Sequence, residues 1–224
     1  MQTLVPVITI DGPSGTGKGT IAQRLAQHLR WHFLDSGVLY RVVAIGAAMH
    51  GIAESDTGAL SDFARQMRVV FSSEFENSIT LDGMEIAALV RTEEAGAKAS
   101  IIATQAPLRS ALLQRQHDFR QAPGLIADGR DMGTVVFPDA SIKFFLTASA
   151  EIRAERRHKQ LINKGVNVSL RTLLNDIQVR DERDSLRLAA PLRQALDAIL
   201  IDTSGMSVDE VFSQVITQVG RLNS

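Results

Sequence analysis

The 224-residue sequence contains no cysteine, and this absence limits the chemistry that the protein can perform. Without cysteine there are no disulfide bonds, no thiolate nucleophile and no cysteine-bound zinc. The N-terminal residues, MQTLVPVITIDG, lack the basic start and the small-residue cleavage site of a signal peptide. We therefore expect a protein of a reducing compartment, the cytoplasm.

Long apolar runs and an excess of one charge are also missing. No apolar run approaches the roughly 20 residues that span a bilayer. With 24 basic and 25 acidic residues the net charge is −1, which argues against binding to nucleic acid or to a membrane surface through bulk charge. We expect neither as a partner, so basic residues that matter must act locally.

The chain contains enough apolar residues, 45% of the total, to bury a core, and they fall into two alternating patterns. Short runs without polar alternation predict buried strands at 5–10, 32–34, 125–127, 142–146 and 198–201. Helical patterns lie at 18–29, 37–49, 107–121, 150–164, 170–188 and 208–222. Alternating strands and helices predict an α/β fold with a five-stranded parallel sheet flanked by helices.

The segment RVVFSSEFENSITLDGMEI, residues 68–86, does not follow that alternation. Its short β-like runs enclose Asp82-Gly83, and this pair between apolar residues is a strong hairpin signal. We expect a small antiparallel insert that belongs to one compact unit with the rest of the chain.

The stretch ITIDGPSGTGKGT, Ile8 to Thr20, predicts a phosphate-binding P-loop. Glycines let backbone N–H groups converge on an anion, the following helix directs its positive end at it, and Lys18 adds a full charge. The expected nucleotide-binding residues are Gly12, Pro13, Ser14, Gly15, Thr16, Gly17, Lys18, Gly19 and Thr20. Gly19 occupies the place where this motif usually has a hydroxyl residue, so Thr20 is the candidate to help hold Mg²⁺. The sequence predicts binding of a nucleoside triphosphate.

Three further clusters accompany the loop. LDSGVLYR (34–41) and IADGRDMGTVVF (126–137) place charges where predicted strands end, at the edge where open α/β sheets bind ligands. In VRDERDSLR, Arg180, Asp184 and Arg187 have the spacing of one helix face. A solvated face with ion pairs is the alternative interpretation of that spacing. The basic stretch RAERRHKQLINKG (153–165) suits a lid over phosphates.

Taken together, DGPSGTGKGT, LDSGVLYR, ADGRDMGTVVFPDA and RDERDSLR resemble the bacterial cytidylate kinases, and the likeness runs essentially from end to end. These are P-loop nucleoside-monophosphate kinases of pyrimidine metabolism, and their loops usually read Gly-Lys-Gly-Thr. The resemblance implies transfer of the γ-phosphoryl of ATP to CMP or dCMP with Mg²⁺. It further implies a P-loop core (1–35, 106–152, 168–224), a monophosphate-binding region (36–105, insert at about 62–90) and a helical lid (153–167). Apart from the resemblance, we expect a monomer.

The resemblance also implies roles for individual residues. The acceptor phosphate and sugar would be held by Ser36, Arg41, Arg130, Arg180, Asp184 and Arg187, and the cytosine would be read by Ser100, Arg109 and Asp131. Catalysis would rest on Lys18, Arg130, Arg180 and Arg187, with Arg153 and Arg157 supplied by the lid. Arg91 is a further candidate for the acceptor pocket, and an ion pair with Glu94 is its alternative.

Two other functions share parts of this pattern. A small-molecule kinase acting on a hydroxyl would need a carboxylate base, for which Asp35 or Asp131 could serve. A non-catalytic nucleotide switch would bind ATP without turnover. A GTP switch is disfavoured, because the one Asn-Lys pair, at 163–164, is followed by Gly-Val and lacks the base-reading aspartate.

Overall fold

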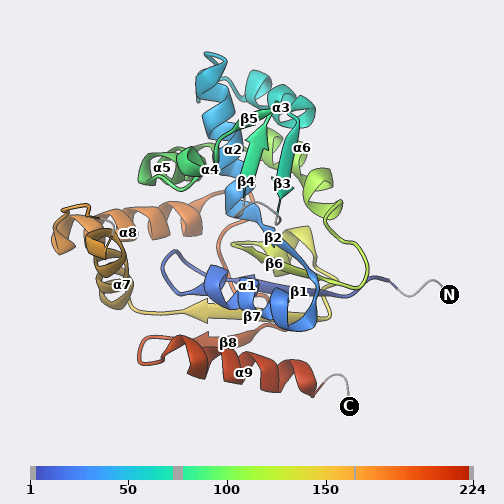
Figure 1. Cartoon of the computed structure of the whole chain (residues 1–224), viewed down its shortest axis with the longest axis vertical. Coiled ribbons are helices and arrows are strands. Elements are labelled where there is room, and N and C mark those ends of the chain that lie inside the picture. Colours follow the sequence, from blue (N-terminus) through green and yellow to red (C-terminus); the bar gives the residue numbers. More distant parts are fainter. Residues whose placement is uncertain (1–3, 73–77, 164, 222–224) are drawn as a thin grey trace. The chain divides into compact units, whose positions relative to one another are not determined.

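A computed structural model of the chain describes residues 4–72, 78–163 and 165–221 (Figure 1). They divide into two compact units: one is formed by Met1–Leu34 together with Phe119–Ser224, and the other by Asp35–Asp118. The expected insert lies in the second unit, and so does residue range 106–118, which the sequence interpretation had assigned to the P-loop core. Each unit has its own hydrophobic core.

The first unit is built on a parallel sheet, as the sequence predicts. Its strands are β1 (Val7–Asp11), β2 (His32–Asp35), β6 (Leu125–Gly129), β7 (Ile142–Thr147) and β8 (Ile199–Asp202), in the order β2-β6-β1-β7-β8. The central strand β1 runs parallel to both β6 and β7, and Ile10 lies opposite Asp128 of β6 and Phe144 of β7. Because all five residues of β1 and of β6 are buried, these strands show the unbroken apolar runs of a covered sheet.

Helices and a short π-helix complete the first unit. They are α1 (Lys18–Leu29), η1 (Met132–Val136), α7 (Ala150–Asn163), α8 (Leu170–Leu186) and α9 (Val208–Gly220). Helix α1 packs against β6 and α9, and α7 packs against α8 (Figure 1). Ser207 and Glu210 form a capping box at the start of α9, the signal that marks this helix in the sequence. Helix α8 ends at Leu186, two residues before the predicted end, so Arg187 follows the helix in extended backbone.

The second unit is mainly helical. It contains α2 (Ser36–Met49), α3 (Thr57–Gln66), α4 (Ala87–Val90), α5 (Glu93–Ile102) and α6 (Ala106–His117), with a sheet of β3 (Val69–Ser72), β4 (Ser78–Leu81) and β5 (Met84–Glu85). Both strand pairings are antiparallel, which confirms the predicted insert, and Asp82 and Gly83 take positive φ in its turn. Part of the predicted segment, 73–77, lies outside the described residues.

Besides the single-turn helix α4, two helices of this unit, α3 and α5, are absent from the sequence prediction. Each begins at a side-chain cap that the sequence contains: Asp56 accepts from the amide of Ala59, and Thr92 from that of Ala95. Helix α6 ends at His117, four residues before its predicted end. The apolar periodicity of α5 is weak, so its cap was the better signal, whereas α3 has both a cap and a clear apolar face that the sequence interpretation did not use.

Candidate active site

The predicted glycine loop connects β1 to α1 through three glycines at positive φ: Gly12 (145°), Gly15 (83°) and Gly17 (91°). A Cβ on Gly12 would lie 2.0 Å from the carbonyl oxygen of Leu146 in β7, so only glycine lets the loop leave the sheet here. Gly17 is the N-cap of α1 and carries no capping side chain, which leaves the first amides of the helix available. Amides at a helix N-terminus form a ready anion site.

Lys18, the first residue of α1, is buried within this loop. Its Nζ donates a hydrogen bond to the carbonyl oxygen of Pro13 (3.1 Å) and lies 3.9 Å from Oδ1 of Asp128. Thr16 Oγ1 donates to the same carbonyl (3.1 Å). The ammonium group of Lys18, the only full positive charge in the loop, is therefore held between a backbone carbonyl and a carboxylate.

Asp128 is a site residue to which the sequence interpretation gave no role. It lies near the end of β6, is buried, and its Oδ2 lies 3.2 Å from the place where a Cβ on Gly19 would be. A Cβ at position 19 would require this carboxylate to shift by a few tenths of an ångström. A carboxylate leaving the strand beside the P-loop strand was the signal available in the sequence.

Asp11 is a second residue that the sequence did not indicate. Its carboxylate accepts hydrogen bonds from the backbone amides of Met132 (2.8 Å) and Gly133 (2.7 Å), at the start of η1. Burial raises the pKa of Asp11 to about 6; the two amide bonds and Lys18 lower it, and Asp131 raises it further. Asp11 thus fixes the segment that follows β6 against the P-loop strand.

The five predicted acceptor-site residues of the first unit form an ionic network. Asp131, Asp184 and Arg187 are buried, and Arg130 and Arg180 are half-buried. Arg130 Nε donates to Oδ2 of Asp184 (3.0 Å). Arg187 Nη2 lies 3.4 Å from Oδ1 of Asp131. Since these side chains are mostly buried, the alternative of a solvated helix face does not describe Asp184 or Arg187.

Asp184 shows how strongly the arginines act on this network. Burial alone would raise the pKa of its carboxyl group, but the guanidinium groups of Arg130, Arg180 and Arg187 outweigh burial and hold that pKa below its usual range. An anion placed beside the same arginines would experience the same attraction. The network therefore offers cationic donors already oriented by carboxylates.

The four remaining acceptor-site residues, Ser36, Arg41, Ser100 and Arg109, all lie in the second unit, on α2, α5 and α6. Arg41 donates to the carbonyl oxygen of Val90 (2.8 Å), and Arg109 donates to that of Ala103 (3.1 Å). Ser36 and Ser100 are buried, and the guanidinium of Arg109 lies 5.6 Å from the ring centre of Tyr40.

The predicted lid coincides largely with α7, and its two named arginines differ in environment. Arg157 is half-buried and donates to Oε1 of Gln160 (3.0 Å). Arg153 is buried and donates hydrogen bonds to acceptors within the protein. Lys164, also in the predicted lid, lies outside the described residues. The weaker candidate Arg91 caps α4, and Glu94 pairs with Lys98 (2.8 Å).

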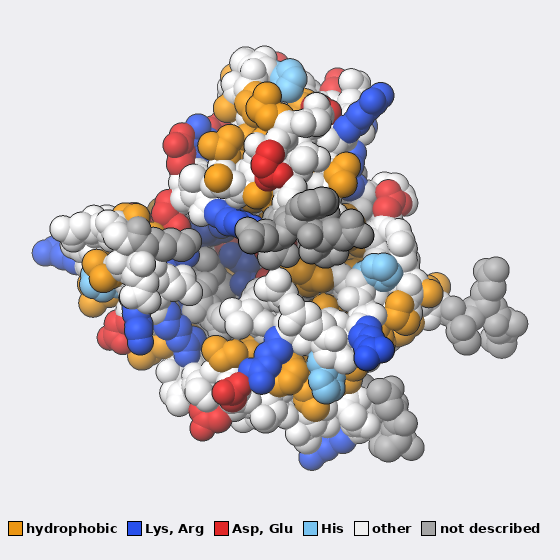
Figure 2. Space-filling view, in the orientation of Figure 1, with side chains coloured by type: hydrophobic (Ala, Val, Ile, Leu, Met, Phe, Trp, Pro, Cys, Tyr) orange, Lys and Arg blue, Asp and Glu red, His pale blue; other side chains and the backbone are white. Residues whose placement is uncertain are grey.

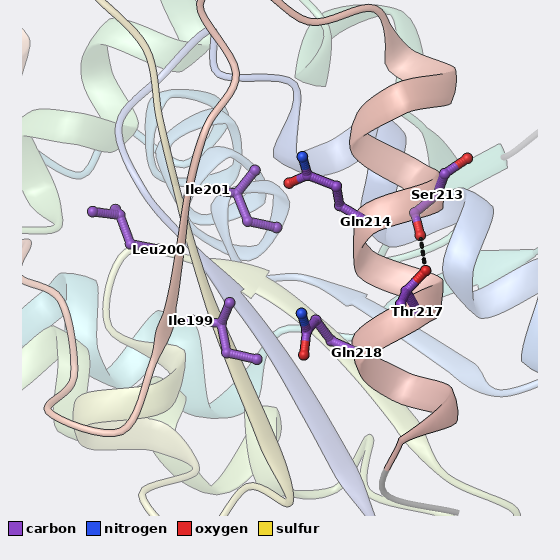
Figure 3. Close-up of a pocket in the computed structure, with 7 residues that line it drawn as sticks. All are labelled: Ile199, Leu200, Ile201, Ser213, Gln214, Thr217 and Gln218. Atoms are coloured by element: carbon purple, nitrogen blue, oxygen red, sulfur yellow. Dashed lines mark hydrogen bonds between the residues drawn. The ribbon is translucent and has the colours of Figure 1, made fainter.

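The described residues also line a groove away from the P-loop, between the edge strand β8 and α9 (Figure 3). It has a volume of about 350 Å³ and is lined by Ile199, Leu200, Ile201, Ser213, Gln214, Thr217 and Gln218. None of these seven residues is charged, so the groove is unsuited to phosphates.

Charged side chains of both signs are scattered over the face shown in Figure 2.

The described part of the chain contains neither a metal-type cluster nor a membrane-spanning helix. Within 4–72, 78–163 and 165–221, no three His, Asp or Glu side chains are grouped as a metal centre would require. In the same residues, no helix is both long and apolar enough to cross a bilayer.

Solved structures with the same arrangement of elements include kinases. A gluconokinase from Sinorhizobium meliloti 1021 has a TM-score of 0.50 at 14% identity, with 98% of this chain and 94% of that chain covered. TT1252 from Thermus thermophilus has a TM-score of 0.51 at 17% identity, with 99% and 100% covered. The parallel sheet and the glycine loop that leads into α1 define a P-loop kinase fold.

Sequence comparison identifies the family within that class. The cytidylate kinase family model matches residues 8–221. A cytidylate kinase of Nitrosococcus oceani is 51% identical over the full length of both chains, and one of Burkholderia ambifaria is 54% identical over 94% of this chain and 91% of that protein. The chain belongs to the cytidylate kinase family, which confirms the resemblance seen in the sequence.

Proposed function

We propose that the protein transfers the γ-phosphoryl group of ATP to CMP or dCMP and releases ADP with CDP or dCDP. The observation that carries the proposal is the identity of 51–54% to cytidylate kinases over nearly the whole chain. The acceptor is a small nucleotide, so the local clusters of arginine in a chain of net charge −1 suit it.

The acceptor oxygen belongs to a phosphate monoester, whose second pKa is about 6, so it is already anionic near neutral pH. No general base is required. Catalysis then consists of bringing two repelling phosphates into line and neutralising charge on the transferred group. Lys18 and the loop amides bind the donor phosphates, and the cationic network around Arg130 and Arg187 binds the acceptor.

We propose that Asp128 and Thr20 hold Mg²⁺. Mg²⁺ keeps several waters and takes one or two carboxylates together with phosphate oxygens, and Asp128 is a buried carboxylate 3.9 Å from Lys18 Nζ. When bound, the ion neutralises charge on the donor phosphates. Thr20 is exposed on the first turn of α1, where its hydroxyl can reach the ion directly or through water.

Base selection is assigned to Ser100, Arg109 and Asp131, sugar and phosphate binding to Ser36, Arg41, Arg130, Arg180, Asp184 and Arg187, and lid closure to 153–167 with Arg157. We propose that a monomer suffices, since one chain supplies all of these groups. Light scattering during gel filtration tests this: a species of twice the chain mass at assay concentration contradicts it.

The test of function is turnover with a panel of acceptors. The protein is incubated with ATP, Mg²⁺ and CMP, dCMP, UMP, AMP or a shikimate-like alcohol, and ADP release is measured. We expect CMP and dCMP to be the preferred acceptors. Preference for the alcohol would identify a hydroxyl kinase, and ATP binding without multiple turnover would identify a switch.

A further inference from the structure

The side chain of Arg153, in the first turn of α7, uses four of its five N–H donors within the protein. Nε donates to the carbonyl oxygen of Ala148 (3.0 Å), and Nη1 donates to that of Ser14 (3.0 Å). Nη1 and Nη2 also contact the two carboxylate oxygens of Asp181 at 3.1 and 2.5 Å. A guanidinium fixed in this way supports the protein around it and has little left for a ligand.

The bond to Ser14 acts on the P-loop itself. In a trans peptide the C=O and the following N–H point in opposite directions, so holding the Ser14 carbonyl toward Arg153 turns the Gly15 N–H away from it. Gly15 has a φ of 83°, and a Cβ there would lie 3.0 Å from Cβ of Arg153. The Arg153 side chain therefore sets the orientation of one of the amides that an anion in the loop would meet.

Asp181 is the residue that holds Arg153 in this place. It lies on α8, 28 positions along the chain, and forms the two-pronged contact that arginine and carboxylate geometry favours. Its side chain is one-quarter exposed, whereas that of Arg153 is buried, so the aspartate carries the charge that keeps the buried guanidinium compensated. Nothing in the sequence distinguishes it from Glu182, its exposed neighbour.

We infer that Asp181 is a positioning residue for the donor nucleotide: through Arg153 it holds the Ser14–Gly15 peptide in the orientation that binds ATP phosphates. Arg153 then acts through the loop backbone instead of contacting the transferred group. The inference rests on the proposed function for the identity of the donor. It requires that loss of Asp181 weaken ATP binding while the acceptor residues on the same helix, beginning with Asp184, remain paired.

The test uses the full-length protein with three single variants, Asp181→Asn, Arg153→Lys and the control Glu182→Gln, which removes the same charge from the adjacent position. ATP affinity is measured by calorimetry without acceptor, and KM values for ATP and CMP by ADP release. We expect Asp181→Asn to weaken ATP binding at least tenfold and to change the KM for CMP less than twofold. Glu182→Gln should change neither by more than twofold.

A double variant and a conservative variant separate positioning from general damage. Arg153→Lys with Asp181→Asn should bind ATP no more weakly than the weaker single variant, because both act through one contact. Asp181→Glu, which keeps the charge, should recover most of the affinity. Should Asp181→Asn fail to fold, Arg153→Lys and Asp181→Glu carry the test.

Unchanged ATP affinity in Asp181→Asn, or an equal rise of both KM values, overturns the inference. An equal loss of ATP affinity in Glu182→Gln would also overturn it, because the effect would then come from the net charge of α8 and not from the contact between Asp181 and Arg153. A wild-type protein that binds ATP but does not phosphorylate CMP would contradict the proposed function alone, because the calorimetric test needs no acceptor.

Discussion

Arg187 and Asp131 lie in contact although 56 positions separate them: Nη2 of the arginine is 3.4 Å from Oδ1 of the aspartate. Arg187 directly follows α8, and Asp131 precedes η1. Both side chains are buried, at 3% and 5% exposure. Two opposite charges withdrawn from water together are retained as a pair, and removing either leaves the other uncompensated.

Replacing Asp131 by alanine should blur the choice between CMP and UMP. Cytosine presents an N4 amino donor beside an N3 acceptor and uracil presents the reverse, so a carboxylate attracts one base and repels the other. Base-edge contacts of this kind discriminate by about 1–3 kcal/mol, or roughly 5- to 150-fold in the ratio of kcat/KM. The measurement is kcat/KM for both nucleotides in wild type and variant.

Because Asp131 also compensates Arg187, the variant should lose activity with both nucleotides as well as selectivity. Asp131→Asn is the companion variant, since it removes the charge while preserving shape. A constant ratio between CMP and UMP in both variants would assign Asp131 to the support of Arg187 and remove it from base selection.

Lys18→Ala should abolish most activity and leave the fold intact. The loop loses its only full positive charge, and electrostatic groups of this kind contribute on the order of 3 kcal/mol, or roughly 100-fold, to turnover. Steady-state kinetics and a thermal melt measure the two effects. Near-normal turnover would exclude the loop from the mechanism. Loss of the cooperative melting transition would show that the buried ion pair between Lys18 and Asp128 is needed for folding.

Gly12→Ala should destabilise the protein more than Gly17→Ala. Both glycines have positive φ, so each substitution strains the backbone by about 1–3 kcal/mol. At position 12 the new Cβ also meets the Leu146 carbonyl at 2.0 Å, whereas at position 17 nothing lies within 4 Å. Denaturant unfolding of both variants gives the difference; equal losses would contradict the steric argument.

Asp11 should make the protein lose stability as pH rises from about 4 to about 6. The pKa of an aspartate in the unfolded chain is 3.8, and that of Asp11 in the folded protein is about 6. Between these two pH values the folded protein therefore keeps a proton on Asp11 that the unfolded chain has released. The unfolded chain binds fewer protons there, and the free energy of unfolding falls with pH, in total by on the order of 3 kcal/mol from this group.

The companion measurement is the same pH series for Asp11→Asn, with the difference between the two curves as the readout. Asp184 contributes with the opposite sign, because its lowered pKa favours the fold above the ordinary range and that contribution is lost on acidification. It is present in both proteins and cancels in the difference. Parallel curves would show that Asp11 titrates normally.

Much of the first unit could be predicted because its signals are local. The unbroken apolar runs of β1 and β6, the glycines of the loop and the Ser207 capping box depend on residues close together in the chain. Side chains are sterically excluded at positive φ, so the glycines at positions 12 and 15 predict such backbone without knowledge of the fold. The insert was found for the same reason, through Asp82-Gly83.

The end of α8 could not be predicted from local signals. Arg187 was predicted on a helix face, yet the helix ends one residue earlier and Arg187 reaches Asp131 from extended backbone. Helix ends depend on whether the next residue gains more from a tertiary contact than from one further helical bond. Local propensity carries no information about that balance.

The sequence by itself determined the fold class, the phosphate loop and the family, because each rests on short-range pattern or on long matched motifs. Only the tertiary structure decided which charges meet. Asp11 finds its amides 121 and 122 positions away, and Arg153 finds Asp181 28 positions away, while the adjacent Glu182 stays exposed. Buried polar groups must be paired, and the partner is chosen by the packing of strands and helices distant in the chain, which no local preference encodes.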